Sequence, residues 1–376
     1  MKGIVLSFAV LAALAASAAK KDKKEAEEPA GRPEAVVAML NSSVSGSPKA
    51  YSDAVAAVAE DAAAGCSLQK FVIALFNGEK SMPAKLKVSE AVRAEYYEKG
   101  RKRIEDLAAQ SNPLALYLLA IDTGDTNTLR RAAEGGNVQA ANAWGLALMS
   151  DVDGPLPDES AKETMKKAFR FFRDAAALRD ANGLYNMGTC YARGLGTEQD
   201  AKRAYECFKS AADKGHPQAI NNLGWCHLKG MGVKEDHTEA AKCFAKSADY
   251  GNAEGQLNYA LALLSGDGVE VNHRTAASLL LQSARQDNLD AMNAYGVCIS
   301  KGRGVKSDPA LAAKWFRAAA ERGHPPAMDN LASCYELGEG LEKSEELAVY
   351  WHMRSLAARG DAYATKWLEE RNKPKP

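Results

Sequence analysis

Residues 186–196, Asn-Met-Gly-Thr-Cys-Tyr-Ala-Arg-Gly-Leu-Gly, are followed 36 residues later by Asn-Leu-Gly-Trp-Cys-His-Leu-Lys-Gly-Met-Gly at 222–232. The small residue at the third position recurs at the same interval along the chain: Gly188, Gly224, Ala260, Gly296 and Ala332. A fixed period of about 20–50 residues indicates a stack of repeated structural units. The regular spacing, more than any single motif, therefore decides the fold.

Each repeat carries two helical stripes. Ala204, Phe208 and Ala211 recur at spacings of four and three, which predicts one helix face, and Gly183 and Met187 predict another. A single pair of such helices cannot bury its apolar face alone, so each pair must pack against the next pair along the chain. The sequence predicts an all-α solenoid of stacked antiparallel helix pairs.

A Gly-x-Gly motif separates the two helices of each repeat. It occurs at Gly194/Gly196, Gly230/Gly232, Gly266/Gly268, Gly302/Gly304 and Gly338/Gly340. No predicted strand precedes these loops, so they do not fit a dinucleotide-binding fingerprint. We expect the glycines to end the first helix with positive φ angles, which glycine adopts at the least cost.

Three patterns recur in register, with departures in individual copies: Leu-Gly-x-x-Tyr, Gly-x-Gly-Val and Ala-x-x-(Trp/Cys)-Phe-x-x-Ala-Ala-x-x-Gly-(His/Asn). Together they resemble the Sel-1-like repeat family, the longer-loop relative of the tetratricopeptide repeat, from about Gly136 to Gly360. The resemblance implies right-handed superhelices that act as protein-interaction scaffolds, often in the bacterial envelope or in signalling complexes. Some copies depart from the pattern, because Ala260 and Ala332 replace the central glycine and Asp287 replaces the glycine between repeats.

The chain is expected to have five parts. They are a signal peptide (1–19), a charged flexible linker with a short candidate helix (20–50), divergent helical cap repeats (51–135), six repeats of about 36 residues (136–361) and a C-terminal capping helix with a tail (362–376). The end units of a solenoid are atypical because an open end would expose apolar surface. Apolar periodicity within the cap region predicts helices at 52–64, 67–76, 89–110, 113–121 and 126–133.

The N-terminus has the features of an export signal. Lys2 precedes the apolar stretch Ile4–Ala16, and Ala16-Ser17-Ala18 fits the small-x-small cleavage rule. The apolar stretch is too short to span a bilayer comfortably, and the alternative is an uncleaved N-terminal anchor. We expect a cleaved bacterial signal peptide, a periplasmic or secreted protein, and no integral membrane segment after cleavage.

Net charge restricts the class of partner. The chain has 48 basic and 48 acidic residues, and its formal net charge is zero. A neutral chain lacks the electrostatic footprint that a nucleic-acid binder needs. We therefore expect a protein or peptide partner, no nucleic acid and no cofactor.

Six of the seven cysteines fall at two repeat positions. Cys190 and Cys207 are 17 residues apart, as are Cys226 and Cys243, so a disulfide between the two helices of a repeat is one interpretation. In two other repeats a tryptophan takes the partner position, which favours free thiols packed in the core: Cys298 with Trp315 and Cys334 with Trp351. A metal site is the third and weakest interpretation, since no C-x-x-C motif occurs.

Catalytic motifs are nearly absent from the sequence. A cysteine-rich, exported subset of the resembled family is linked to β-lactam binding or hydrolysis, and residues 67–70 match S-x-x-K. The S-D-N and K-T-G motifs that accompany it in such enzymes do not occur. We expect no catalytic residues; the alternatives are a β-lactam hydrolase and a secreted modulator of host or cell-wall proteins.

The candidate binding site is the face of the first helix of each repeat, which lines the concave side in tetratricopeptide-like stacks. The residues projected onto it are Tyr185, Thr189, Arg193, Asn221, Trp225, Lys229, Asn293 and Asp329. An aromatic residue flanked by amides and cations is typical of a peptide-binding groove. The neighbouring series Asn186, Asn222, Asn258 and Asn330 is expected to bond backbone groups between repeats.

Overall fold

The computed structural model describes residues 66–76, 89–150 and 159–372, and scattered positions among 35–62. The expected signal peptide, most of the linker, the loop at 151–158 and the tail at 373–376 lie outside the described residues. Within the described ranges all regular structure is helical, which confirms the predicted fold class. Clustering of contacts divides the chain into two compact units, one ending at Ala219 with Met231–Val233 added, the other formed by Ile220–Gly230 and Lys234–Pro376.

The first unit contains eight labelled helices within the described residues: α4 (Ser67–Phe76), α5 (Glu90–Ala109), α6 (Pro113–Thr123), α7 (Thr126–Glu134), α8 (Val138–Ser150), α9 (Glu159–Ala177), α10 (Ala181–Arg193) and α11 (Ala201–Ala212). The helices predicted at 67–76, 89–110, 113–121 and 126–133 are confirmed to within two residues at each end. Ser89 caps α5 by accepting a bond from the Val92 amide.

Helix α12 (Pro217–Lys229) crosses the boundary between the units. The second unit continues with α13 (His237–Asp249), α14 (Ala253–Ser265), α15 (His273–Ala284), α16 (Leu289–Lys301), α17 (Pro309–Glu321), α18 (Pro325–Leu337), α19 (Glu345–Ala358) and α20 (Ala362–Asn372). We call the first and second helix of each repeat helix A and helix B.

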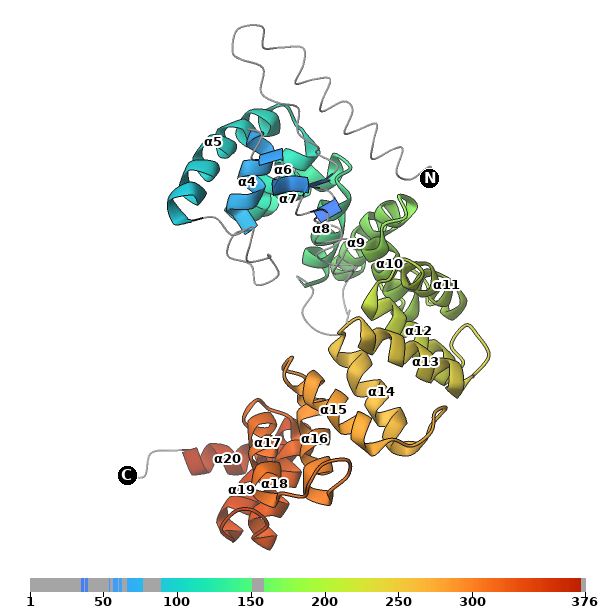
Figure 1. Ribbon diagram of the computed structural model, residues 1–376, viewed down its shortest axis with the longest axis vertical. Coiled ribbons are helices and arrows are strands. Elements are labelled where there is room, and N and C mark those ends of the chain that lie inside the picture. The colour runs from blue at the N-terminus through green and yellow to red at the C-terminus, as the bar shows by residue number, and fades with distance from the viewer. Residues whose placement is uncertain are drawn as a thin grey trace, which may run out of the picture. The chain divides into compact units, whose positions relative to one another are not determined.

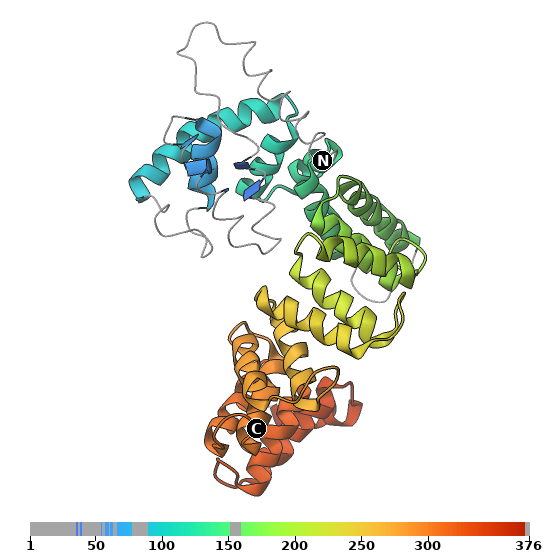
Figure 2. The ribbon, with the colours of Figure 1, turned by 45° about the vertical axis from the view of Figure 1, so that its right-hand side comes forward.

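Helices pack in succession inside each unit. In the second unit, α14 packs on α15, α16 on α17 and α18 on α19, which are the A–B pairs of three repeats. The contacts between α13 and α14, α15 and α16, and α17 and α18 join one repeat to the next. Figures 1 and 2 show this order along the yellow, orange and red part of the ribbon. The arrangement is the predicted succession of helix pairs.

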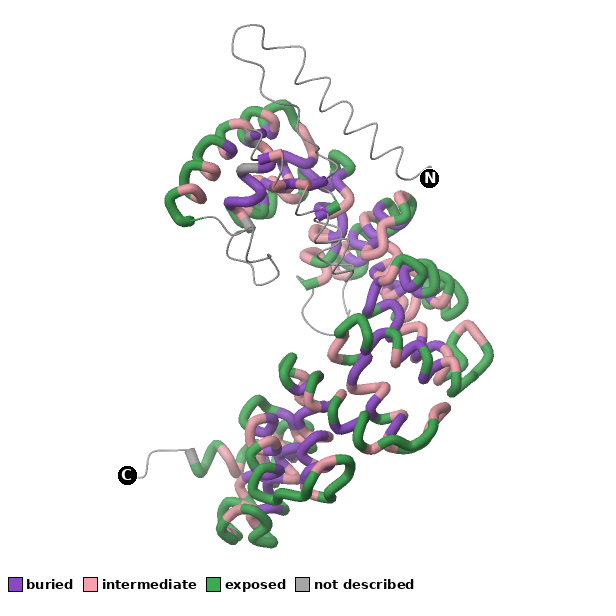
Figure 3. Tube along the Cα trace, in the orientation of Figure 1, coloured by how far each residue is buried: buried purple, intermediate pink, exposed green. Residues whose placement is uncertain are grey.

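The core lies along the helix faces that the sequence predicted. Ala204, Phe208 and Ala211 of α11 are all buried, and the burial recurs at the same positions of α13 and α17. Figure 3 shows purple, buried residues alternating along each helix with pink and green ones, while the loops between helices are mostly green. Alanine lets two helix backbones approach closely, and the phenylalanine fills the remaining volume.

Each Gly-x-Gly motif has two different roles. Its first glycine is the αL C-cap of helix A, with φ +71° at Gly194 and +67° at Gly302, as expected. The second glycine has a positive φ too, but it also meets the backbone of the preceding repeat: Gly304 lies against the carbonyl of His273, the first residue of α15. Gly232, Gly268 and Gly340 make the same contact with the first residue of helix B one repeat earlier. The sequence had predicted only the capping role.

Helix α20 has the position of a helix A without a helix B after it among the described residues. Ala364 is buried in the register of the small residues that pack on the preceding repeat, whereas Glu369 and Arg371 take the positions at which other repeats contact their own helix B. Charged side chains at these positions suit a helix that packs on one side only, and the capping role stays a prediction. Among helices of the described ranges, none combines the length and apolarity needed to cross a bilayer.

Candidate functional site

The candidate binding residues lie on four A helices. Helix α10 carries Tyr185, Thr189 and Arg193 in the first unit. In the second unit α12 carries Asn221, Trp225 and Lys229, while α16 carries Asn293 and α18 carries Asp329. We call these eight residues the helix-A face and describe them unit by unit.

On α10, only part of the helix-A face is accessible. Tyr185 is half-buried and stacks on His216, with ring centroids 4.6 Å apart and an interplanar angle of 18°. The Thr189 hydroxyl donates to the Tyr185 carbonyl at 3.1 Å. Arg193 is exposed and has no ion pair with any described residue. The exposed Arg193 guanidinium is therefore the most accessible group that this helix offers to a ligand.

On α12, the three residues differ sharply in burial. Asn221 is only 1% exposed, whereas Lys229 is exposed. Trp225 lies between these extremes: it packs edge-to-face on Phe244 of α13, at a centroid distance of 5.7 Å, and keeps part of its indole at the surface. A half-exposed tryptophan next to a free cation is a suitable anchor for a peptide.

Two of the predicted site residues form side-chain bonds between repeats. The Asn221 carbonyl oxygen accepts from Asn258 Nδ2 at 2.9 Å, and Asn293 accepts from Asn330 Nδ2 at 2.7 Å. We expected the recurring asparagines to bond backbone groups, and at these positions this is wrong. Asn258 and Asn330 instead bond the side-chain oxygen of an asparagine in the preceding repeat. In the first unit Asn186 bonds Asn142 in the same way, at 3.4 Å.

Asp329 has basic neighbours that the sequence pattern did not indicate. The Arg359 guanidinium, at the C-cap of α19, lies 2.6 Å from Asp329 Oδ2, and His352 Nδ1 lies 3.4 Å from Oδ1. The Asp329 carboxylate thus has both of its basic partners within its own repeat. Both basic groups are on or just after helix B, and only the pairing of the two helices brings them to a helix-A residue.

The cysteines are packed inside the helical core. None of the seven cysteines forms a disulfide bond, and all seven are buried. Burial raises the pKa of the Cys190 thiol to about 12 and those of Cys207, Cys226 and Cys243 to about 11, which suppresses the reactive thiolate. No group of three or more His, Cys, Asp or Glu within the described ranges could hold a metal ion. The S-x-x-K segment lies in the first turn of α4.

The histidines at repeat boundaries act as helix caps. His216 Nδ1 accepts from the Ala219 amide at 3.2 Å, and its Nε2 lies 3.1 Å from Asn182 Oδ1, so Nε2 carries the hydrogen. His324 caps α18 with the same geometry.

We expect the protein to lose stability below about pH 6.5 through His216. Burial lowers the pKa of His216 to about 4. The folded state therefore favours the neutral ring. The stability that His216 contributes is fully present above the pKa of the unfolded state and is lost as the pH falls towards 4. The loss amounts to about 1–2 kcal/mol at pH 5.5. Urea unfolding of wild type and His216→Asn at pH 7.5 and 5.5 measures it; the variant keeps a capping side chain, as at Asn252, and should show a smaller decrease.

Comparisons with known proteins agree with the geometry. The Sel1 repeat model matches five consecutive segments: 181–216, 217–252, 253–288, 289–324 and 325–357. No curated protein matches the chain significantly.

Several solved structures are similar to this chain, and two of them are described here. One is c5321, a protective antigen of uropathogenic Escherichia coli with an SLR fold; it is 24% identical, with a TM-score of 0.55, over 85% of this chain and 68% of that one. The other is a Sel1 repeat protein of Oxalobacter formigenes, which is 27% identical with a TM-score of 0.48 over 56% of this chain and 88% of that one. The first likeness supports the helical-repeat fold.

Proposed function

We propose that this protein is an exported scaffold that binds a protein partner through its helix-A face. The proposal starts from residues 181–357, which belong to the Sel1 repeat family. Proteins of this family are helical scaffolds that commonly mediate protein–protein interaction, and they are generally not catalytic. The proposal adds three elements for this chain: export, the face used, and Trp225 as the central anchor.

Trp225 carries the proposal because the stack does not require a tryptophan at its position. The equivalent residue in the other four matched repeats is small or aliphatic: Thr189, Leu261, Val297 and Ser333. Leu261 is also exposed at this position. A large indole that is kept partly in solvent, where a leucine or a serine suffices for folding, supports a role in binding.

We expect Trp225→Leu to weaken partner binding by about tenfold or more while leaving the fold intact. Leucine occupies the same position at Leu261, so the contact with Phe244 is largely maintained. The partner is first captured with a photo-crosslinking residue at Lys229, on the helix-A face, and its affinity for wild type and variant is then measured with purified components.

The matched control places the same crosslinker at Lys246, which is exposed on helix B of that repeat. If both positions capture the same protein equally, or if Trp225→Leu binds it as tightly as wild type, the helix-A face is not the binding surface.

Export is proposed from the N-terminal sequence. The full chain is produced in a bacterial host, and intact-mass analysis of its periplasmic fraction is expected to show a chain that begins after Ala18 or Ala19. A full-length mass in the membrane fraction would instead indicate the uncleaved anchor.

A further inference from the structure

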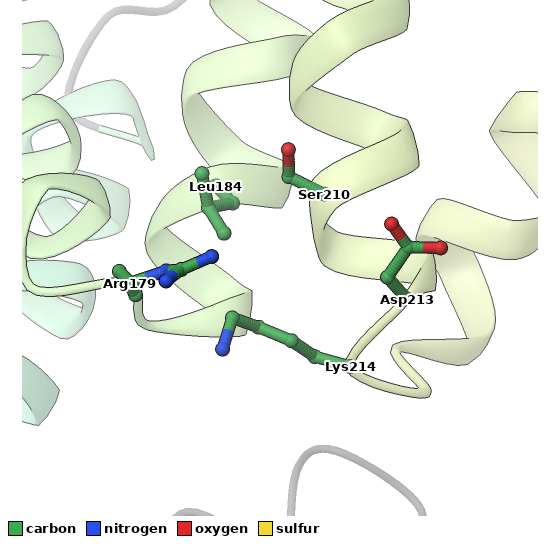
Figure 4. A pocket seen from close by; sticks show the side chains of 5 residues that line it. All are labelled: Arg179, Leu184, Ser210, Asp213 and Lys214. Atoms are coloured by element: carbon green, nitrogen blue, oxygen red, sulfur yellow. The ribbon is translucent and has the colours of Figure 1, made fainter. Parts of the chain in front are cut away.

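A small pocket in the first unit brings two cations together. It has a volume of about 310 Å³ and is lined by Arg179, Leu184, Ser210, Asp213 and Lys214. Arg179 lies in the turn before α10, and the last three residues belong to the end of α11 and the turn after it. Figure 4 shows the Arg179 and Lys214 side chains entering the pocket region from opposite sides. Neither cation forms an ion pair with a residue that the structure describes.

The same two repeat positions hold an ion pair elsewhere in the chain. Asp287 lies three repeat periods after Arg179, and Arg322 lies three periods after Lys214. In the second unit the Asp287 carboxylate accepts from Arg322 at 2.7 Å. The fold thus places a carboxylate and a cation at this pair of positions in one copy, and two cations in the other. The first-unit pocket lacks the carboxylate that its counterpart supplies.

The backbone conformation at Arg179 supports a functional role for its side chain. Arg179 has φ +59°, in the left-handed region, and the equivalent residues in three of the other repeats are glycines: Gly215, Gly251 and Gly323. Asp287 shares the conformation, with φ +68°, but aspartate tolerates it better than arginine does. An arginine kept in a strained conformation where glycine is the usual solution indicates a function for the guanidinium.

Two carboxylates lie near the pocket, but only Asp213 is among the residues that line it. Asp180 attracts the Lys214 ammonium electrostatically. Its Oδ1 accepts hydrogen bonds from the Gly183 amide at 2.9 Å and from Asn142 Nδ2 at 2.7 Å. Asp213 lines the pocket, and its carboxylate points away from the two cations. Among the residues that line the pocket, two cations and one carboxylate give a net positive charge.

We propose that this pocket binds a carboxylate side chain of an acidic peptide segment on the protein partner. The carboxylate would lie between Arg179 and Lys214, in the role that Asp287 has beside Arg322. A planar guanidinium can hold both carboxylate oxygens, while the ammonium adds a point charge and the Ser210 hydroxyl a further donor. The inference rests on the proposed function only in taking a protein as the ligand.

The test uses a fluorescent decapeptide of alternating glutamate and serine, with a glutamine version as its neutral counterpart. Anisotropy with the full chain at low salt is expected to show binding of the glutamate peptide only. Arg179→Asp should weaken this binding by about tenfold or more. The variant should fold at least as well as wild type, because it gives Lys214 the partner that Arg322 already has, and a thermal melt verifies this.

Two further variants sharpen the result. Arg274→Asp makes the same charge change at an exposed residue of α15 and should leave the affinity unchanged. Asp287→Arg places two cations at the second copy of the site and should add a second binding site for the peptide. Inorganic phosphate at equal ionic strength should compete no better than simple salt.

Several outcomes would overturn the assignment. They are equal binding of the two peptides, unchanged affinity in Arg179→Asp, an equal loss in Arg274→Asp, or displacement by phosphate beyond the effect of salt. Trp225→Leu is expected to leave peptide binding unchanged, since Trp225 does not line the pocket. Failure of the helix-A face and failure of this pocket are therefore separate results.

Discussion

Gly304→Ala is expected to destabilise the protein by about 3 kcal/mol or more, whereas Gly302→Ala, in the same loop, should cost only about 1 kcal/mol. Both glycines have positive φ angles, +75° and +67°, so both substitutions carry the same conformational cost. They differ in their surroundings. A Cβ on Gly302 would meet only ordinary contacts at 3.5 Å and beyond, but a Cβ on Gly304 would overlap the His273 carbonyl and lie 2.7 Å from the Arg274 nitrogen.

The overlap at Gly304 cannot be relieved by a side-chain rotation. The atoms in the way are backbone at the start of α15, so the loop must move away from the preceding repeat. The interface between repeats supplies much of the stability of a solenoid, because each repeat contacts only its neighbours. A local substitution is therefore expected to weaken the coupling between two repeats.

Urea unfolding followed by circular dichroism, together with amide hydrogen exchange, measures the effect. Faster exchange should appear in α15 and α16, on either side of the altered contact. Gly323→Ala is a second control, since it has φ +90° and no neighbouring atom within 4 Å of the added Cβ. Equal destabilisation by all three substitutions would show that φ alone decides the cost.

This pair of glycines shows what the sequence could predict. The helix bounds follow from the period and from apolar spacing, so α5 was expected at 89–110 and occupies Glu90–Ala109. The C-cap at Gly302 is a local property and was predicted as well. The second role of Gly304 depends on the distance between successive repeats, which is fixed by side chains of four helices and is not encoded in any short segment.

The candidate site was less predictable for the same reason. Asn221 and Asn293 were placed on a binding face by spacing, but spacing does not show that an asparagine of the next repeat bonds each of them. Arg359 reaches Asp329 from the next turn after helix B. The signal for the carboxylate pocket was present, since Arg179 stands in register with glycines and with Asp287. Its meaning required the ion pair between Asp287 and Arg322.

Gly296→Ala is expected to destabilise the protein by about 2–3 kcal/mol, and Phe316→Leu in the same chain should restore most of the loss. The added Cβ would lie 2.6 Å from Cε1 of the Phe316 ring, which is only 4% exposed and has no room to move. Alanine favours a helix over glycine by about 1 kcal/mol, so the measured cost is the overlap less this gain.

The chain itself indicates the compensating substitution. Four central glycines face a phenylalanine of their own helix B: Gly145 with Phe172, Gly188 with Phe208, Gly224 with Phe244 and Gly296 with Phe316. Where alanine replaces the glycine, at Ala260 and Ala332, the phenylalanine position holds Leu280 and His352. The departures from the repeat pattern are thus paired substitutions. A Cβ and a full aromatic ring do not fit together in this space.

A double-mutant cycle measures the coupling. Phe316→Leu alone should cost about 1 kcal/mol, because it leaves a cavity beside the glycine. In the double variant the Cβ of alanine fills part of that cavity, as it does beside Leu280, which is fully buried. We expect a coupling free energy of about 2 kcal/mol. Additive costs would contradict the steric explanation and leave the paired substitutions without a physical cause. The repeat tolerates either combination, Gly with Phe or Ala with Leu, because each fills the space between the two helices once.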